Sequence, residues 1–235
     1  YVDSHNAYVS LVETLDHSGV DLDTGVEIVW ISSEKINATS TSRLQNLDGI
    51  VIPAGFGERG FEGKVNTAKY AREKGVPVLM IGMGAQAGLV EYSRNVCGME
   101  KANSTEFDRK PQYPVVYSLY EAPRFRCGAY TTLLKTGSRL KEIYGKDEIS
   151  ERHRHKYEFN PALAKQIEKA GLVFSGKAQS GKVYEAYELP THPFYIGVMF
   201  RPEFKSRPLC PHPLITAFIK ACKTYADQKR ESDKQ

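Results

Sequence analysis

The sequence predicts an α/β fold with a mixed, mainly parallel sheet flanked by helices. In the first hundred residues, short apolar runs typical of buried strands alternate with segments of helical period. In the second half, strand-like segments with looser connections follow one another and end on a helix. Continuous apolar runs are typical of parallel strands that are covered on both faces, which places the parallel strands in the first half.

The composition bounds the class of protein. A chain of 235 residues with 41 % apolar and 26 % charged residues is long and apolar enough to bury a core, which excludes wholesale disorder. No apolar run reaches the ~18 residues of a spanning helix. The net charge of +4 gives no support for nucleic-acid binding. We therefore expect neither a nucleic acid nor a membrane as partner.

The elements of the first half follow from apolar spacing. Apolar residues recur at helical spacing from Tyr8 to Leu15, and Gly19 is suited to end this helix. The elements expected next are a strand at 26–31, a polar segment at 32–46, a strand at 48–53, a glycine loop at 54–60, a helix at 61–74, a strand at 76–81 and a helix at 85–96.

The second half has strand patterns and two helices. Strands are expected at 115–119, 126–133, 151–159, 173–175, 182–187 and 195–200, and helices at 162–170 and 213–225. We find no internal repeat and no linker, so we expect one domain over residues 1–228. Residues 229–235 are predicted to be a charged, frayed tail.

The cysteines and the N-terminus indicate the compartment. Cys97, Cys127, Cys210 and Cys222 form no C-x-x-C pair, so reduced intracellular thiols are expected. The chain begins with Tyr1 rather than Met, so its start is expected to be incomplete, and the first ten residues lack the pattern of a signal peptide.

The glycine loop matches a dinucleotide-binding fingerprint only in part. Gly55, Gly57 and Gly60 form G-x-G-x-x-G between a strand and a helix. The fingerprint also needs an acidic residue ~20 positions on, where this chain has Met80, Ile81 and Gly82. The loop therefore predicts a tight turn or another use, and no cofactor is expected.

Residues 79–86 have the strand-turn-helix layout of a nucleophile elbow. Its apex is Gly82, which carries no nucleophile. The terminus of the following helix offers backbone donors to an anion, so an anion-binding turn and a plain strand-to-helix turn are both open.

A basic segment alternates in period two. As a strand it places Arg152, Arg154 and Lys156 on one face and His153 and His155 on the other. Two histidines can bind a metal, but no third ligand shares the spacing, so no metal is expected. A positively lined anion pocket and a solvated basic strand stay open.

A charged pair stands near the end of the last strand. Arg201 and Glu203 could pair with each other there, and the sequence alone favours an ion pair at the surface.

Together these segments resemble the glutaminase domain of CTP synthase, a class I glutamine amidotransferase. The most specific matches are residues 103–107 and 151–155; others lie at 1–3, 7–13, 53–60 and 192–208. The resemblance implies the three-layer fold of that family and a cytoplasmic location. In the family a strand precedes the position of Tyr1, so the first strand of the domain is expected to be missing.

The resemblance also implies a damaged catalytic site. The family nucleophile is a Cys, activated by a His and oriented by a Glu; the aligned residues are Gly82, Arg201 and Glu203. Glycine cannot attack a carbonyl, and arginine stays protonated, so it cannot act as the base. Ala54 replaces a glycine of the oxyanion loop, and Lys156 replaces the glutamine-binding Arg.

These departures predict a degenerate glutaminase domain without glutamine hydrolysis. It would act as a non-catalytic ligand-binding or regulatory module; the alternatives are new chemistry in the pocket and a part of a CTP synthase that uses free ammonia. A small anion is the expected ligand, and a synthase domain or a second copy the expected partner. With the triad gone, Arg201 should pair with Glu203 or occupy the space above Gly82. The expected pocket residues are Ala54, Gly55, Phe56, Gly57, Gly82, Met83, Gln86, Glu106, Arg126, Lys156, Tyr157, Arg201 and Glu203.

Overall fold

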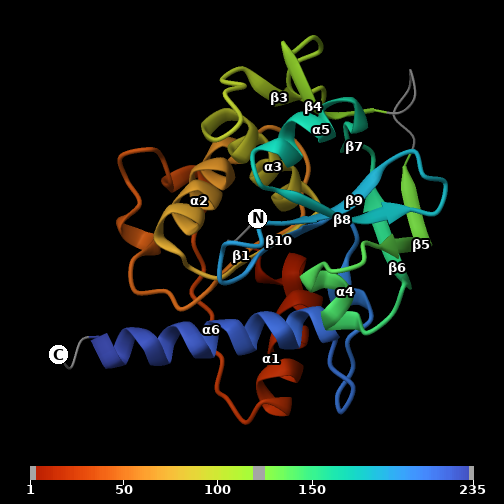
Figure 1. Cartoon of the computed structure of the whole chain (residues 1–235). Coiled ribbons are helices and arrows are strands. Elements are labelled where there is room, and N and C mark those ends of the chain that lie inside the picture. The colour runs from red at the N-terminus through yellow and green to blue at the C-terminus, as the bar shows by residue number, and fades with distance from the viewer. Residues whose placement is uncertain (1–3, 119–124, 233–235) are drawn as a thin grey trace.

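The computed structural model describes residues 4–118 and 125–232, which form one curled sheet between two layers of helices (Figure 1). One layer contains α2 (Phe61–Lys74), α3 (Met83–Asn95) and α5 (Pro161–Lys169). The other contains α1 (Val9–Asp21), α4 (Arg139–Tyr144) and α6 (Pro213–Ser232). The three-layer α/β arrangement expected from the sequence is confirmed.

The sheet has the order β1-β2-β10-β9-β7-β4-β3, and β8, β5 and β6 continue from β9 as a second branch. Its strands are β1 (Ile50–Ile52), β2 (Val78–Ile81), β3 (Ala102–Ser104), β4 (Tyr113–Tyr117), β5 (Arg126–Leu134), β6 (Glu148–His155), β7 (Glu158–Phe159), β8 (Val173–Ala178), β9 (Tyr184–Glu188) and β10 (Tyr195–Val198).

Strand direction changes between the two halves. β1, β2 and β10 run parallel, as do β3 and β4. The other pairs are antiparallel, so the parallel part of this mixed sheet is smaller than expected. The short connections of the second half explain this, because parallel neighbours need a longer crossover.

The two cores lie on opposite faces of the sheet. Val78 and Met80 of β2 pack into the core beneath α2 and α3, and Leu79 and Ile81 into the core beneath α1 and α6. This alternation explains why β2 is apolar at every position.

Several predicted elements differ from the structure. Residues 26–31 form no strand: Val26 and Ile28 pack against the second core, and Trp30 stacks on His5, without ladder hydrogen bonds. The strand predicted at 151–159 is divided between β6 and β7, which belong to different pairs. The predictions missed α4 and β3.

Some predictions reach residues outside the described part of the chain. α6 continues to Ser232, so residues 229–232 of the predicted tail are helical, and residues 233–235 are not described. Leu119 of the strand predicted at 115–119 and the matched segment 1–3 also lie outside it. Short 3₁₀ turns complete the fold at η1 (His5–Tyr8), η2 (Ser33–Lys35), η3 (Ser42–Leu44) and η4 (Pro202–Phe204).

Candidate functional site

The elbow is the turn from β2 through Gly82 into α3. Gly82 has φ +54° and ψ −113°, a conformation that favours glycine. Its N–H donates to the carbonyl of Val198 in β10 at 2.7 Å, and its carbonyl accepts from the N–H of Gln86 at 3.0 Å. The apex is therefore fixed both to the sheet and to the first turn of α3, as the elbow layout predicted.

Position 54 limits what position 82 can carry. A Cβ added to Gly82 would lie 3.1 Å from the Cβ of Ala54 and would meet no other residue within 4 Å. That contact is closer than ordinary van der Waals packing. A side chain at position 82 would therefore require Ala54 to shift.

Lys64 supports the loop that follows β1 and was missed by the sequence analysis. Its Nζ donates to the carbonyl of Pro53 at 3.0 Å, and a Cβ on Gly55 would lie 3.3 Å from this Nζ. Burial lowers the pKa of Lys64 to about 8. The helical spacing of Lys64 with Phe61 and Ala68, two buried residues of α2, was a signal that could have found it.

Glu106 joins the loop to the basic strand. The N–H of Gly57 donates to its Oε1 at 3.1 Å. Burial raises the pKa of Glu106, while this hydrogen bond and the charge of Lys156 oppose the rise. Burial, with the charge of Glu106, raises the pKa of Tyr157. The structure thus brings these four predicted residues together.

Arg201 and Glu203 form an ion pair, with Arg201 Nε 2.5 Å from Glu203 Oε1. The Glu203 side chain is 3 % exposed and that of Arg201 16 %, so the surface pair favoured by the sequence alone is wrong, because the pair is largely buried. The Arg201 guanidinium lies 4.6 Å from the ring centre of Phe204. It does not fill the space next to Gly82. Of the two arrangements expected after loss of the triad, pairing is the one observed.

Arg126 was expected in the pocket but serves a buried network. Its guanidinium bonds to Glu158 at 3.0 Å and to Glu185 at 2.5 Å. Thr132 donates to the second oxygen of Glu185. Burial raises the pKa of Glu158 to about 7, although Arg126 opposes the shift. Arg126 thus links its own strand β5 to β7 and β9 through buried carboxylates.

The two histidines of the basic strand lie beside this network. His153 Nδ1 is 2.9 Å from His155 Nε2, and His155 Nδ1 is 3.1 Å from the carbonyl of Tyr157. The carbonyl can only accept, so His155 carries its proton on Nδ1 and His153 donates from Nδ1. Burial lowers the pKa of His153 to about 2 and that of His155 to about 3. Within residues 4–118 and 125–232 no three potential metal ligands gather.

The remaining predicted residues lie along the elbow and its loop. Met83 and Gln86 are buried in the first turn of α3, and the Oε1 of Gln86 has no hydrogen-bond partner. Phe56 is 72 % exposed. Two cations of the site have acidic neighbours, since Arg201 bonds to Glu203 and Lys156 lies in the field of Glu106. Their positive charge is therefore partly offset, whereas Lys64 bonds only to the carbonyl of Pro53 among the described residues.

Comparison with known proteins places this geometry in a family. The sequence model described as glutamine amidotransferase class-I matches residues 4–221. The chain belongs to the class-I glutamine amidotransferase family. This amidotransferase domain is also similar to the Trypanosoma brucei CTPS glutaminase domain with bound acivicin, with a TM-score of 0.90 and 30 % identity, covering 95 % of this chain and 91 % of that one.

Whole CTP synthases are also similar to this amidotransferase domain. The protein of Rubrobacter xylanophilus is 43 % identical over 97 % of this chain, and that of Methanocaldococcus jannaschii is 44 % identical over 94 %. The domain spans only 43 % and 44 % of the length of these relatives. A protein of Thermoplasma acidophilum described as a GMP synthase component, at 18 % identity and a TM-score of 0.59, covering 91 % of this chain and 88 % of that one, shares the fold. In the described part of the amidotransferase domain, no helix is long and apolar enough to cross a membrane.

Proposed function

We propose that this chain is a degenerate CTP synthase-type glutaminase domain that does not hydrolyse glutamine and acts as a non-catalytic ligand-binding or regulatory module. The observation that carries the proposal is the apex of the elbow. Glycine stands there, and the Cβ of Ala54 lies close to where a side chain would begin. No nucleophile can act from this position.

The residue at the expected place of the base supports the same conclusion. Arg201 keeps its proton at any physiological pH and bonds to Glu203. It therefore cannot take a proton from a nucleophile or a water molecule. Glu203, whose family role is to orient a histidine, is engaged by the arginine instead.

The polar residues near the elbow support the proposal of a retained binding surface. The Gly57–Glu106 hydrogen bond, with Lys156 and Tyr157 beside it, gives an ordered polar wall. A small anion is the ligand class that we propose, and it must compete with Glu106 for Lys156. This requirement predicts weak binding rather than tight binding.

The experiment is an ammonia-release assay with glutamine. The control is the CTP synthase of Bacillus subtilis, a relative 42 % identical to this chain over 97 % of its length, which covers 44 % of that protein. We expect turnover at the buffer background. Acivicin, which is bound in the Trypanosoma brucei domain, should leave the intact mass of this chain unchanged. Ammonia release at the rate of the control, or a stoichiometric acivicin adduct, overturns the proposal.

A second candidate is that the domain belongs to a CTP synthase that uses free ammonia. The observation that favours it is the length of the relatives, of which the chain spans 43 % and 44 %. A synthase domain and a homo-oligomer are then the partners, and the location is cytoplasmic. The full-length protein should then form CTP with ammonium chloride but not with glutamine, whereas a separate module would form none.

A further inference from the structure

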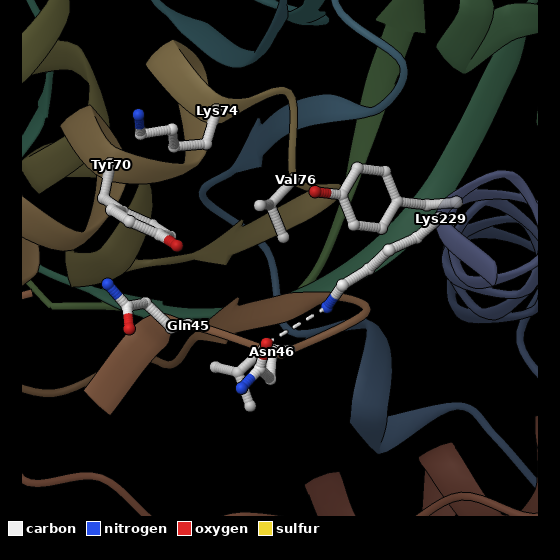
Figure 2. Close-up of a pocket in the computed structure, with 8 residues that line it drawn as sticks. Gln45, Asn46, Tyr70, Lys74, Val76 and Lys229 are labelled. Atoms are coloured by element: carbon white, nitrogen blue, oxygen red, sulfur yellow. Dashed lines mark hydrogen bonds between the residues drawn. The ribbon is translucent and has the colours of Figure 1, made fainter. Parts of the chain in front are cut away.

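A groove of about 290 Å³ lies away from the elbow (Figure 2). We call it the basic groove; its residues are Gln45, Asn46, Leu47, Tyr70, Lys74, Val76, Tyr225 and Lys229. They come from the segment before β1, the end of α2 with the residues before β2, and the last turns of α6. The groove therefore lies at the amino ends of β1 and β2, whereas the elbow follows the carboxyl end of β2.

Among the described residues, the lysines of the basic groove have no acidic partner. In the part of the chain that the structure describes, no carboxylate lies within ion-pair distance of Lys74 or Lys229. Two acidic neighbours along the chain are engaged elsewhere: Glu73 pairs with Arg72 at 3.4 Å, and Asp227 with Arg230 at 3.8 Å. Two ammonium groups therefore line the groove without an ion-pair partner among residues 4–118 and 125–232, and Figure 2 shows that of Lys74 pointing away from Lys229.

Lys229 reaches into the groove with only a weak contact to hold it. Its Nζ is 3.5 Å from Asn46 Oδ1, a long and weak hydrogen bond that a ligand can displace. Asn46 has φ +66°, so its loop turns sharply at the floor of the groove. The side-chain amide of Asn46 then becomes a further donor for a ligand.

Two tyrosines supply flat walls and hydroxyl donors. The hydroxyl of Tyr70 points toward the middle of the groove in Figure 2. Burial, with the nearby Tyr225, raises the pKa of Tyr70, so its phenol stays protonated and able to donate. The phenol rings, Leu47 and Val76 make the remaining walls apolar enough to pack against an organic group.

We propose that the basic groove binds a small molecule that carries a phosphate group on a planar organic group. All its charged side chains are ammonium groups, its phenols and amides can donate, and no carboxylate lines it. A phosphate presents only acceptors and negative charge, so it matches this set. The volume is at the lower end for ligand sites, which favours a small molecule. This inference is independent of the proposed function.

The test measures binding of two probes, phenyl phosphate and inorganic phosphate, to the whole chain by calorimetry and NMR titration. We expect phenyl phosphate to bind more tightly, because its ring contacts the tyrosine walls. Lys74→Ala with Lys229→Ala should weaken phenyl phosphate by at least about 10-fold, the loss expected for two charge-assisted contacts. The control replaces Lys69 and Lys223, which lie on the same two helices outside the groove, and should leave binding unchanged.

A second variant separates the ring from the phosphate. Tyr70→Leu with Tyr225→Leu should weaken the binding of phenyl phosphate at least about 3-fold more than that of inorganic phosphate. Only phenyl phosphate has a ring that contacts the two tyrosine rings. Binding to the unaltered chain should also weaken as sodium chloride rises. The proposal is overturned if neither probe binds at millimolar concentration, if the groove variant binds like the unaltered chain, or if the control variant is weakened equally.

Discussion

The elbow and the basic groove lie at opposite ends of the same two strands and treat charge in opposite ways. At the elbow, Arg201 is bonded to a carboxylate that is 3 % exposed, and Lys156 lies beside Glu106. At the groove, Lys74 is exposed and Lys229 half-buried, and no carboxylate pairs with either within the described residues. The difference is consistent with burial, since the Arg201–Glu203 pair is largely buried and an unpaired buried charge is costly.

The comparison also separates a site that we propose has lost its chemistry from a groove with room for a ligand. At the elbow, Ala54 lies against the one position where a nucleophile would start, and Glu203 has a new cation for a partner. Both features fit the proposed loss of glutamine hydrolysis. The groove shows no such adjustment, because within the described residues its two lysines have no ion pair and Lys229 makes only one weak hydrogen bond.

The largest expected effect is a partial recovery of glutaminase activity. Gly82→Cys alone should stay at background, because the new Cβ meets Ala54 at 3.1 Å and no base is present. The triple variant Gly82→Cys with Ala54→Gly and Arg201→His should release ammonia at least about 10-fold faster than this background. It should still fall well short of the ~10⁶ that a complete triad supplies, since Lys156 lacks the bidentate fork of arginine.

The ammonia-release assay measures this series, and Gly82→Ser with the same two changes is the matched control. The serine variant has the same shape with a weaker nucleophile and should remain at background. Full recovery in Gly82→Cys alone would contradict the idea that the site is closed by several residues.

The next effect concerns the ion pair at the elbow. Arg201→Ala leaves the Glu203 carboxylate buried, where its Oε2 already lacks a partner. We expect a loss of about 2–4 kcal/mol in the free energy of unfolding, near the range for breaking a buried pair. The melting temperature should fall by about 5–10 °C in a chain of this size.

Thermal and urea unfolding measure the change. Arg201→Met with Glu203→Leu is the control and should restore most of the stability, because it removes both charges. Equal stability of Arg201→Ala and the unaltered chain would show that the pair contributes nothing.

A smaller effect is expected at Lys64. Its folded-state pKa of about 8 lies below the ordinary value near 10.4, so the folded protein binds fewer protons than the unfolded chain between these values. Stability then rises with pH across this window, and the cost of the buried ammonium is complete below pH 8. Relative to Lys64→Met, the unaltered chain should gain up to about 3 kcal/mol between pH 8 and 10.5.

Urea unfolding of both proteins across this pH range tests the prediction. Lys69→Met on the same helix is the control, and the unaltered chain should show no such gain against it. If Lys64→Met and the unaltered chain keep a constant difference in stability, Lys64 has no shifted pKa.

The sequence predicted best what local patterns determine. The helix at 61–74 and the alternation of His153 and His155 away from Arg152 and Arg154 follow from periodicity, and both are found. The segment 26–31 has the apolar run of a buried strand but forms none, because pairing depends on a neighbouring strand that local pattern does not specify.

The sequence predicted many residues of the candidate site but not all of the residues with which they form ion pairs. The pairing of Arg126 with Glu158 and Glu185 joins residues 32 and 59 positions apart, which no spacing rule connects. Lys64 was missed because a lysine after a glycine loop is ordinarily a surface residue. The sequence also did not predict the basic groove, because its residues come from three segments that only the fold brings together.

The smallest expected effect is the change in stability when the two lysines of the basic groove are removed, and it distinguishes the groove from the elbow. Lys74→Ala with Lys229→Ala removes no ion pair and only one weak hydrogen bond, so the free energy of unfolding should change by no more than about 0.5 kcal/mol. A stabilisation within that range would fit relief of repulsion between two uncompensated cations. Urea unfolding beside Arg201→Ala measures the contrast directly. A loss as large as that of Arg201→Ala would mean that the groove lysines hold the fold together, and their lack of partners would then give no reason to assign them a ligand.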